Sequence, residues 1–197
     1  MRVALNPAGK PILFLVGLCS LPLAAQDQPA VAFASLLGGA GTDDCDAVAV
    51  DAAGNTFLGC HLSSVDIPGS DKFPFSLAGN MDAFVIKLDA GDASVAYIAH
   101  WGGADWDAIQ GLTTDAEGSV YAVGVSNSND FPVSTSAAQG AFGGDSEIFL
   151  TKVDPSGKIV WTRFFGGDGD EDSQASDIAL DKQGNILITG YGPDHFH

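Results

Sequence analysis

The stretch DAAGNTFL, from Asp51 to Leu58, recurs in related form as DAEGSVYA at 115–122 and as DKQGNILI at 181–188. In each copy an Asp leads to a Gly three positions later, and a run rich in apolar and β-branched residues follows. The Asp side chain can bond to nearby backbone at the start of a type I turn, and the Gly then adopts the positive φ of a bulged hairpin. The sequence therefore predicts three β-hairpins, because a β-carbon at the turn would be strained. The turn glycines are Gly54, Gly118 and Gly184.

The hairpins belong to a longer repeat. A Gly-Gly pair recurs with a period of 64 residues, and an aromatic residue precedes each pair by five positions. The pairs lie at 38–39, 102–103 and 166–167, and the aromatic residues are Phe33, Tyr97 and Trp161. Two further patterns occur twice, Asp-x-Pro at 66–68 and 130–132 and Phe-x-x-Lys-x-Asp at 84–89 and 149–154. Each unit predicts about four short antiparallel strands with little helix.

A four-stranded unit cannot bury both of its faces alone, so it must stack on a copy of itself. Four-stranded sheets repeated radially form a β-propeller. We therefore predict an all-β chain of tandem four-stranded antiparallel blades in a partial or open β-propeller. A β-helix has much shorter rungs, and a β-sandwich does not require near-identical turns at this period. The predicted divisions are 1–25 as a signal peptide, repeat units at 31–94 and 95–158, and an incomplete unit at 159–197.

The order of these motifs resembles the bacterial β-propeller repeat called the SBBP repeat. The motifs are Trp161 with Gly166-Gly167, Asp181 with Gly184-Asn185, Asp130-Phe131-Pro132, and Phe149 with Lys152 and Asp154. The resemblance covers Val31 to about Gly190. It implies an exported or surface protein of a bacterium with propeller blades, and it implies no shared catalytic residues.

The number of units departs from a complete propeller, which typically holds four to eight blades. Two units are full, and the third stops after its hairpin. We expect a piece of a longer product, an assembly of copies, or sheets that stay open. Open strand edges invite pairing with other chains, so self-association is an expected partner interaction.

The first 25 residues have the pattern of a secretory signal peptide, with a basic start, an apolar run at 11–23 and small residues before Gln26. The expected location is therefore secreted, periplasmic or at the cell surface. Removal of this segment takes away Arg2 and Lys10 and none of the 25 acidic residues. A surface this acidic repels nucleic acid and the anionic head groups of lipids. We predict no membrane-spanning segment in the mature chain.

Acidic loops follow the Gly-Gly pairs. In unit three Asp168, Asp170 and Asp172 stand at alternate positions, which can direct oxygen ligands at one Ca²⁺ ion. Ca²⁺ is the one candidate cofactor, and a solvated turn is the plainer alternative. The corresponding loops contain Asp43, Asp44 and Asp46 in unit one, and only Asp105 and Asp107 in unit two.

Cys45 and Cys60 flank the first hairpin and fall opposite each other within one residue of register when Val50 pairs near Thr56. They are a candidate cross-strand disulfide in an oxidising compartment, and two buried free thiols are the alternative. Trp106 lies in the acidic loop of unit two and is the aromatic residue that we consider for ligand contact.

No nucleophile elbow, His-centred constellation or phosphate loop is visible in the sequence. We therefore predict a noncatalytic propeller-repeat module for binding a protein or glycan, or for surface architecture, with loops such as 126–130 as the contact surface. A hydrolase or lyase acting on polysaccharide and a nonfunctional fragment of a longer protein are the alternatives.

Overall fold

The computed structural model describes residues 34–134, 146–165 and 173–192. Within these ranges the chain forms ten β-strands and no helix, so the all-β prediction is confirmed. The described part also lacks any helix with the length and apolar character needed to cross a membrane.

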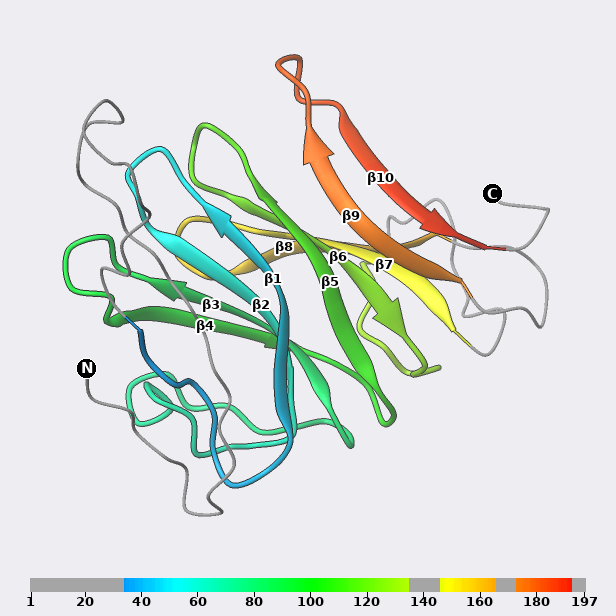
Figure 1. The fold of residues 1–197 in the computed structure, drawn as a ribbon. Coiled ribbons are helices and arrows are strands. Elements are labelled where there is room, and N and C mark those ends of the chain that lie inside the picture. The colour runs from blue at the N-terminus through cyan, green and yellow to red at the C-terminus, as the bar shows by residue number, and fades with distance from the viewer. Residues whose placement is uncertain (1–33, 135–145, 166–172, 193–197) are drawn as a thin grey trace.

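The strands form two four-stranded antiparallel sheets and one hairpin (Figure 1). The first sheet has the order β1 (Asp43–Val50), β2 (Thr56–Leu62), β3 (Asp82–Leu88) and β4 (Val95–Trp101). The second has the order β5 (Asp107–Thr114), β6 (Val120–Ser126), β7 (Glu147–Val153) and β8 (Ile159–Phe165). The hairpin consists of β9 (Gln174–Leu180) and β10 (Ile186–Tyr191).

The sheets stack as the blades of an open, partial β-propeller. β5 packs against β1 and β2 of the first sheet, and β9 packs in the same way against β5 and β6 (Figure 1). The fourth strands, β4 and β8, begin at Val95 and Ile159, where the second and third sequence units begin. Each four-stranded sheet therefore takes its last strand from the start of the next sequence unit.

The hairpin turns have the backbone geometry that their sequence requires. The φ angles of Gly54, Gly118 and Gly184 are 86°, 82° and 82°. In the third hairpin Asp181 Oδ1 accepts hydrogen bonds from the backbone N–H groups of Gln183 and Asn185, both at 2.8 Å. Hydrogen bonds from the side chain and the backbone of Asn185 hold the pKa of Asp181 below its ordinary value. The Asp therefore fixes the turn as a hydrogen-bond acceptor.

The first strand of each sheet or hairpin contains a β-bulge at the same place. The pairing skips one residue between Cys45 and Ala47 in β1, between Ile109 and Gly111 in β5, and opposite Thr189 and Gly190 in β9. The skipped residues are Asp46, Gln110 and Ser176. A bulge bends a strand and increases its twist, so the three equivalent strands share one local curvature.

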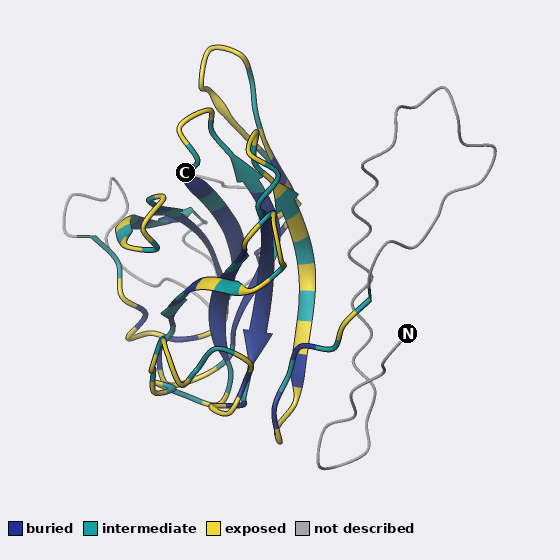
Figure 2. Cartoon of the chain, turned by 90° about the vertical axis from the view of Figure 1, so that its left-hand side faces the viewer, coloured by how far each residue is buried: buried dark blue, intermediate teal, exposed yellow. Residues whose placement is uncertain are grey.

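The core consists of apolar layers on the faces of the sheets. Between the first two sheets, Phe57 and Tyr97 pack with Ile109 and Phe149. Between the second sheet and the hairpin, Ile148 and Leu150 pack with Ile178. Every residue of β2 is buried. Because successive side chains of a strand point to opposite faces, both faces of this central strand are covered. Figure 2 shows buried strands in the interior of the stacked sheets. Leu58, Cys60 and Ile86 form the layer on the remaining face of the first sheet.

Candidate functional site

The Gly-Gly loop before β1 is held by side chains that accept hydrogen bonds from its backbone. Four consecutive N–H groups, those of Gly39, Ala40, Gly41 and Thr42, donate respectively to Asp43 Oδ2 at 2.8 Å, Asp66 Oδ1 at 2.9 Å, Ser64 Oγ at 2.7 Å and Ser63 Oγ at 2.7 Å. Three of these acceptors lie 21 to 26 residues away in the chain. The loop is therefore fixed by the segment that follows β2.

The second repeat contains the same arrangement. The N–H groups of Gly103, Ala104 and Asp105 donate respectively to Asp107 Oδ2 at 2.7 Å, Asp130 Oδ1 at 2.8 Å and Ser128 Oγ at 2.9 Å. A β-carbon on Gly103 would collide with the side chains of Asp130 and Ser128. The Gly-Gly pair and the Asp-x-Pro motif, which are distant in the sequence, are thus two halves of one structural unit.

Two acids of the loops considered for Ca²⁺ are buried rather than solvated. Asp43 is 3% exposed and Asp107 has no exposed surface. The Asp107 carboxylate also accepts hydrogen bonds from Ser126 Oγ at 2.5 Å and Ser128 Oγ at 3.0 Å. Burial raises the pKa of Asp107, and these hydrogen bonds oppose the shift. The interpretation of a solvated turn is wrong for Asp43 and Asp107, because both carboxylates close the loop that precedes them.

A third buried carboxylate, that of Asp82 at the start of β3, has the same kind of role. It accepts hydrogen bonds from the N–H groups of Ala78 and Gly79 at 2.7 and 3.2 Å, and it contacts His100 Nε2 at 2.5 Å. Asp82 and Asp107 lie close enough for the charge of Asp82 to contribute to the raised pKa of Asp107. The oxygens of both acids are already engaged by the protein.

In the loop 126–130, Asn127, Asn129 and Asp130 are exposed, whereas Ser126 and Ser128 are buried. Ser126 and Ser128 are fully buried and bonded to Asp107, and the Asp130 carboxylate accepts from Ala104 N–H. The proposed contact role of this loop is therefore wrong at Ser126 and Ser128. Their polar atoms stabilise the adjoining loop.

The predicted Ca²⁺ ligands Asp168, Asp170 and Asp172 lie outside the described residues, so the Ca²⁺ site stays a prediction. Within the described ranges, no group of three or more His, Cys, Asp or Glu side chains has an arrangement that could hold a metal ion.

Cys45 and Cys60 form a disulfide between β1 and β2. Without a bulge, the hairpin register would place Asp46 opposite Cys60. Because the pairing skips Asp46, Cys45 lies opposite Cys60 instead. The covalent link fixes the first strand of the first sheet to its second strand.

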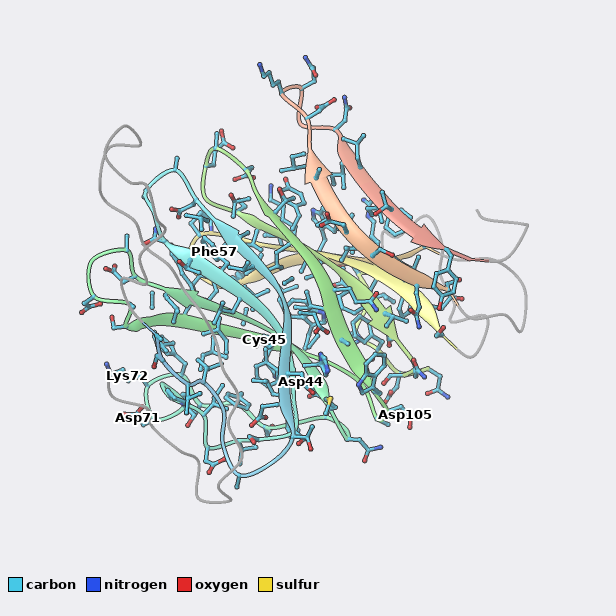
Figure 3. The ribbon with its side chains drawn as sticks, in the orientation of Figure 1. Asp44, Cys45, Phe57, Asp71, Lys72 and Asp105 are labelled. Atoms are coloured by element: carbon cyan, nitrogen blue, oxygen red, sulfur yellow. A yellow bond between two sulfur atoms is a disulfide. The ribbon has the colours of Figure 1, made fainter. Side chains whose placement is uncertain are left out.

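A polar cluster lies next to this disulfide and consists of His61, Asp44, Asp46 and Trp106. His61 on β2 is buried, with its Nε2 3.8 Å from Asp44 Oδ2 and its Nδ1 3.5 Å from Asp46 Oδ2. Its ring meets Trp106 edge-on, with the ring centres 5.7 Å apart. The two carboxylate side chains are 59% and 55% exposed, so the cluster presents acceptors to solvent. Figure 3 labels Asp44 and Cys45 on β1 and Asp105 in the connection that leads into β5.

A scan against protein-family models matches residues 160–196 to the SBBP family, described as a beta-propeller repeat. The chain carries an SBBP-type repeat. A search of curated proteins found no match.

The His61 cluster is absent from the second repeat unit of this chain. The residues that occupy the places of Asp44, Asp46 and His61 in the second unit are Ala108, Gln110 and Val125. The cluster is thus specific to the first repeat, whereas the loop-closing acids Asp43 and Asp107 occur in both. The sequence prediction missed His61, although a comparison of the first two repeat units position by position would have found it.

The lysines of the Phe-x-x-Lys-x-Asp patterns, Lys87 and Lys152, contact residues of neighbouring strands. Lys152 Nζ lies 2.7 Å from Tyr121 Oη and 3.3 Å from Asp115 Oδ2, in the neighbouring hairpin. Lys87 Nζ lies over the rings of Phe57 and Tyr97, with centroid distances of 5.3 and 5.9 Å. The motif therefore joins the third strand of a four-stranded sheet to the first hairpin of that sheet.

A cavity of about 330 Å³ lies between the second sheet and β10. Its walls are Ile148 and Phe165 from the second sheet, and Ile188, Gly190, Tyr191 and Gly192 from β10 and the residue after it. The sequence did not indicate this cavity, because it lies between strands that are distant in the chain.

Proposed function

We propose that this SBBP-type repeat protein is a noncatalytic binding module that works outside the cytoplasm. The observation that carries the proposal is that some acidic residues are buried and stabilise loops, whereas others are exposed to solvent. Asp43, Asp82 and Asp107 are buried and closed by hydrogen bonds of the fold. Asp44 and Asp46 are exposed and occur in the first repeat only.

The exposed cluster has the chemistry of a polar contact surface. Two carboxylates can accept hydrogen bonds from hydroxyl or amide groups, and the partly buried Trp106 offers an aromatic surface beside them. This combination suits a glycan, which presents both hydroxyl groups and apolar ring faces. A rigid sheet with a disulfide beneath the cluster keeps the contact groups in place.

Export is supported by the N-terminal signal pattern and by the disulfide, since disulfides persist in oxidising compartments. Fractionation of a producing bacterium and N-terminal sequencing of the exported chain test this part. We expect the mature chain outside the cytoplasm and cleaved near Ala25. An uncleaved chain in the cytoplasm would contradict it.

The binding role is tested with a glycan array probed by the wild-type protein and by an Asp44→Asn/Asp46→Asn variant. We expect the wild type to retain a defined set of glycans and the variant to lose them at unchanged melting temperature. The matched control is Asp105→Asn, an exposed acid outside the cluster, which should bind like the wild type. Release of reducing sugar from the retained glycans would instead support a polysaccharide hydrolase.

A further inference from the structure

The outer edge of β10 differs from the equivalent edges of the other two hairpins. β2 pairs with β1 on one side and with β3 on the other, and β6 pairs with β5 and β7. Among the described residues, β10 pairs with β9 alone. Its side chains are correspondingly exposed, Leu187 by 54% and Tyr191 by 58%.

The register of the hairpins shows which positions correspond. Val120 pairs with Thr114 and Gly124 with Ile109 in the second sheet. In the third hairpin Ile186 pairs with Leu180 and Gly190 with Ala175. Gly190 therefore occupies the place of Gly124, and each residue of β10 corresponds to the β6 residue 66 positions earlier.

In the second sheet, Phe149 of β7 lies opposite Gly124. A β-carbon on Gly124 would lie 2.6 Å from the ring atom Cζ of Phe149, so the ring covers the glycine. The ring also meets Trp101 of the first sheet edge-on, with centres 6.1 Å apart, and stacks on Phe131 at 4.9 Å. Phe149 thus fills the junction between the first two sheets.

The cavity beside β10 is the corresponding position one junction later. Four of its lining residues, Phe165, Ile148, Ile188 and Gly190, correspond to Trp101, Ala83, Ala122 and Gly124. Three of these, Trp101, Ala83 and Ala122, belong with Phe149 to one buried cluster. The cavity therefore has the walls of a phenylalanine site, formed by the second sheet and β10.

The charges correspond as well. Lys152 of β7 lies opposite Tyr121 and contacts Asp115, the first residue of the hairpin turn. The same positions in the third hairpin are Leu187 and Asp181. A strand paired to β10 in this register would thus bring a lysine to the Asp181 carboxylate when its phenylalanine enters the cavity.

We propose that the outer edge of β10 binds an extended strand with the pattern Phe-x-x-Lys-x-Asp by β-strand addition. The phenylalanine fills the cavity at Gly190, and the lysine reaches Asp181. A folded second copy cannot supply this strand, because its β3 and β7 are central strands that are paired on both sides. The partner is therefore a strand of a further repeat of this type that is not held within its own sheet.

The test uses the full chain and a synthetic peptide with the sequence SEIFLTKVD, residues 146–154. Titration calorimetry should show binding, and hydrogen exchange should show new protection at 186–191 with little change in β2 and β6. A Phe149→Ala peptide should bind at least about tenfold more weakly, because a buried aromatic side chain is lost. A Leu150→Ala peptide is the matched control, since Leu150 would face away from the cavity, and it should lose much less affinity.

A protein variant tests the register. Asp181→Asn keeps an acceptor for the turn and removes the charge. It should weaken binding of the lysine peptide about two- to fivefold and leave a Lys152→Ala peptide unaffected. Absence of binding at millimolar peptide, protection outside β10, or equal affinity of the Phe149→Ala peptide would overturn the proposal. A concentration-dependent dimer that the peptide does not dissociate would also overturn it.

Discussion

Cys45 on β1 lies directly opposite Cys60 on β2, and the disulfide between them stands beside the bulge at Asp46. The link closes a loop of 15 residues in the unfolded chain. In the chain-entropy account, such a loop contributes about 3 kcal/mol to the free energy of unfolding.

A Cys45→Ala/Cys60→Ala variant should therefore lose about 2–4 kcal/mol of unfolding free energy in urea denaturation. Reduction of the wild type should produce a similar loss, and reduction should not change the variant. Unchanged stability of the variant, or free thiols in the mass spectrum of the non-reduced protein, would contradict the structure.

Replacement of Asp107 by Asn should change how stability depends on pH. The pKa of Asp107 is raised because burial disfavours its carboxylate, so its contribution is greatest at low pH and falls as pH rises through the folded pKa. Asn cannot accept all of the hydrogen bonds that Asp107 accepts, which should cost about 1–3 kcal/mol. The deficit of the variant relative to wild type should be largest below about pH 4 and shrink toward neutral pH in urea titrations. Exposed Asp105→Asn is the control, with a change within about 0.5 kcal/mol.

Gly118→Ala should cost about 1 kcal/mol because of its backbone conformation alone. Its φ is 82°, and an added β-carbon would meet its nearest neighbour, Pro155, only at 4.0 Å. Gly118→Asn should cost less, since Asn tolerates this conformation better. Thermal unfolding of the two variants checks the order, and an Ala variant as stable as wild type would rule out strain as the reason for glycine here.

The Ca²⁺ prediction is tested by calorimetry and thermal unfolding of protein treated with a chelator. If Asp168, Asp170 and Asp172 bind Ca²⁺, its addition should raise the melting temperature, because a ligand of the folded state stabilises it. Substitution of these three residues by Asn should abolish the effect, whereas Asp44→Asn/Asp46→Asn should preserve it. No heat of binding and no thermal shift would exclude the site.

The all-β fold was predictable because its signals are local. A hairpin needs Asp-x-x-Gly within eight residues, and stacking follows from the repeat of that unit. The start of β1 at Asp43 was harder to predict than the hairpin turn that follows this strand. Asp43 continues the strand because its carboxylate is held by Ser64, 21 residues away, and no local pattern contains that pairing.

The contact groups were predicted less well than the fold. Trp106 was identified because aromatic residues in acidic loops are conspicuous, but its neighbour His61 is on a strand that otherwise reads as core. The cavity at Gly190 depends on how a second sheet and a distant hairpin approach each other. The sequence shows that the Phe-x-x-Lys-x-Asp pattern occurs twice and not three times. Only the stacked sheets show that Phe149 of the second pattern fills the junction between two sheets.

The bulge of the first strands carries Asp46, Gln110 and Ser176, three residues of different chemistry. The bend therefore depends on the strand pairing on either side of the bulge and not on the identity of the skipped residue, so this residue can vary. Tandem duplication of the coding segment would copy the bend intact, and later drift at that codon would cost little. Each new copy can thus acquire its own surface chemistry beside the first strand of its sheet, as the first copy has with Asp46.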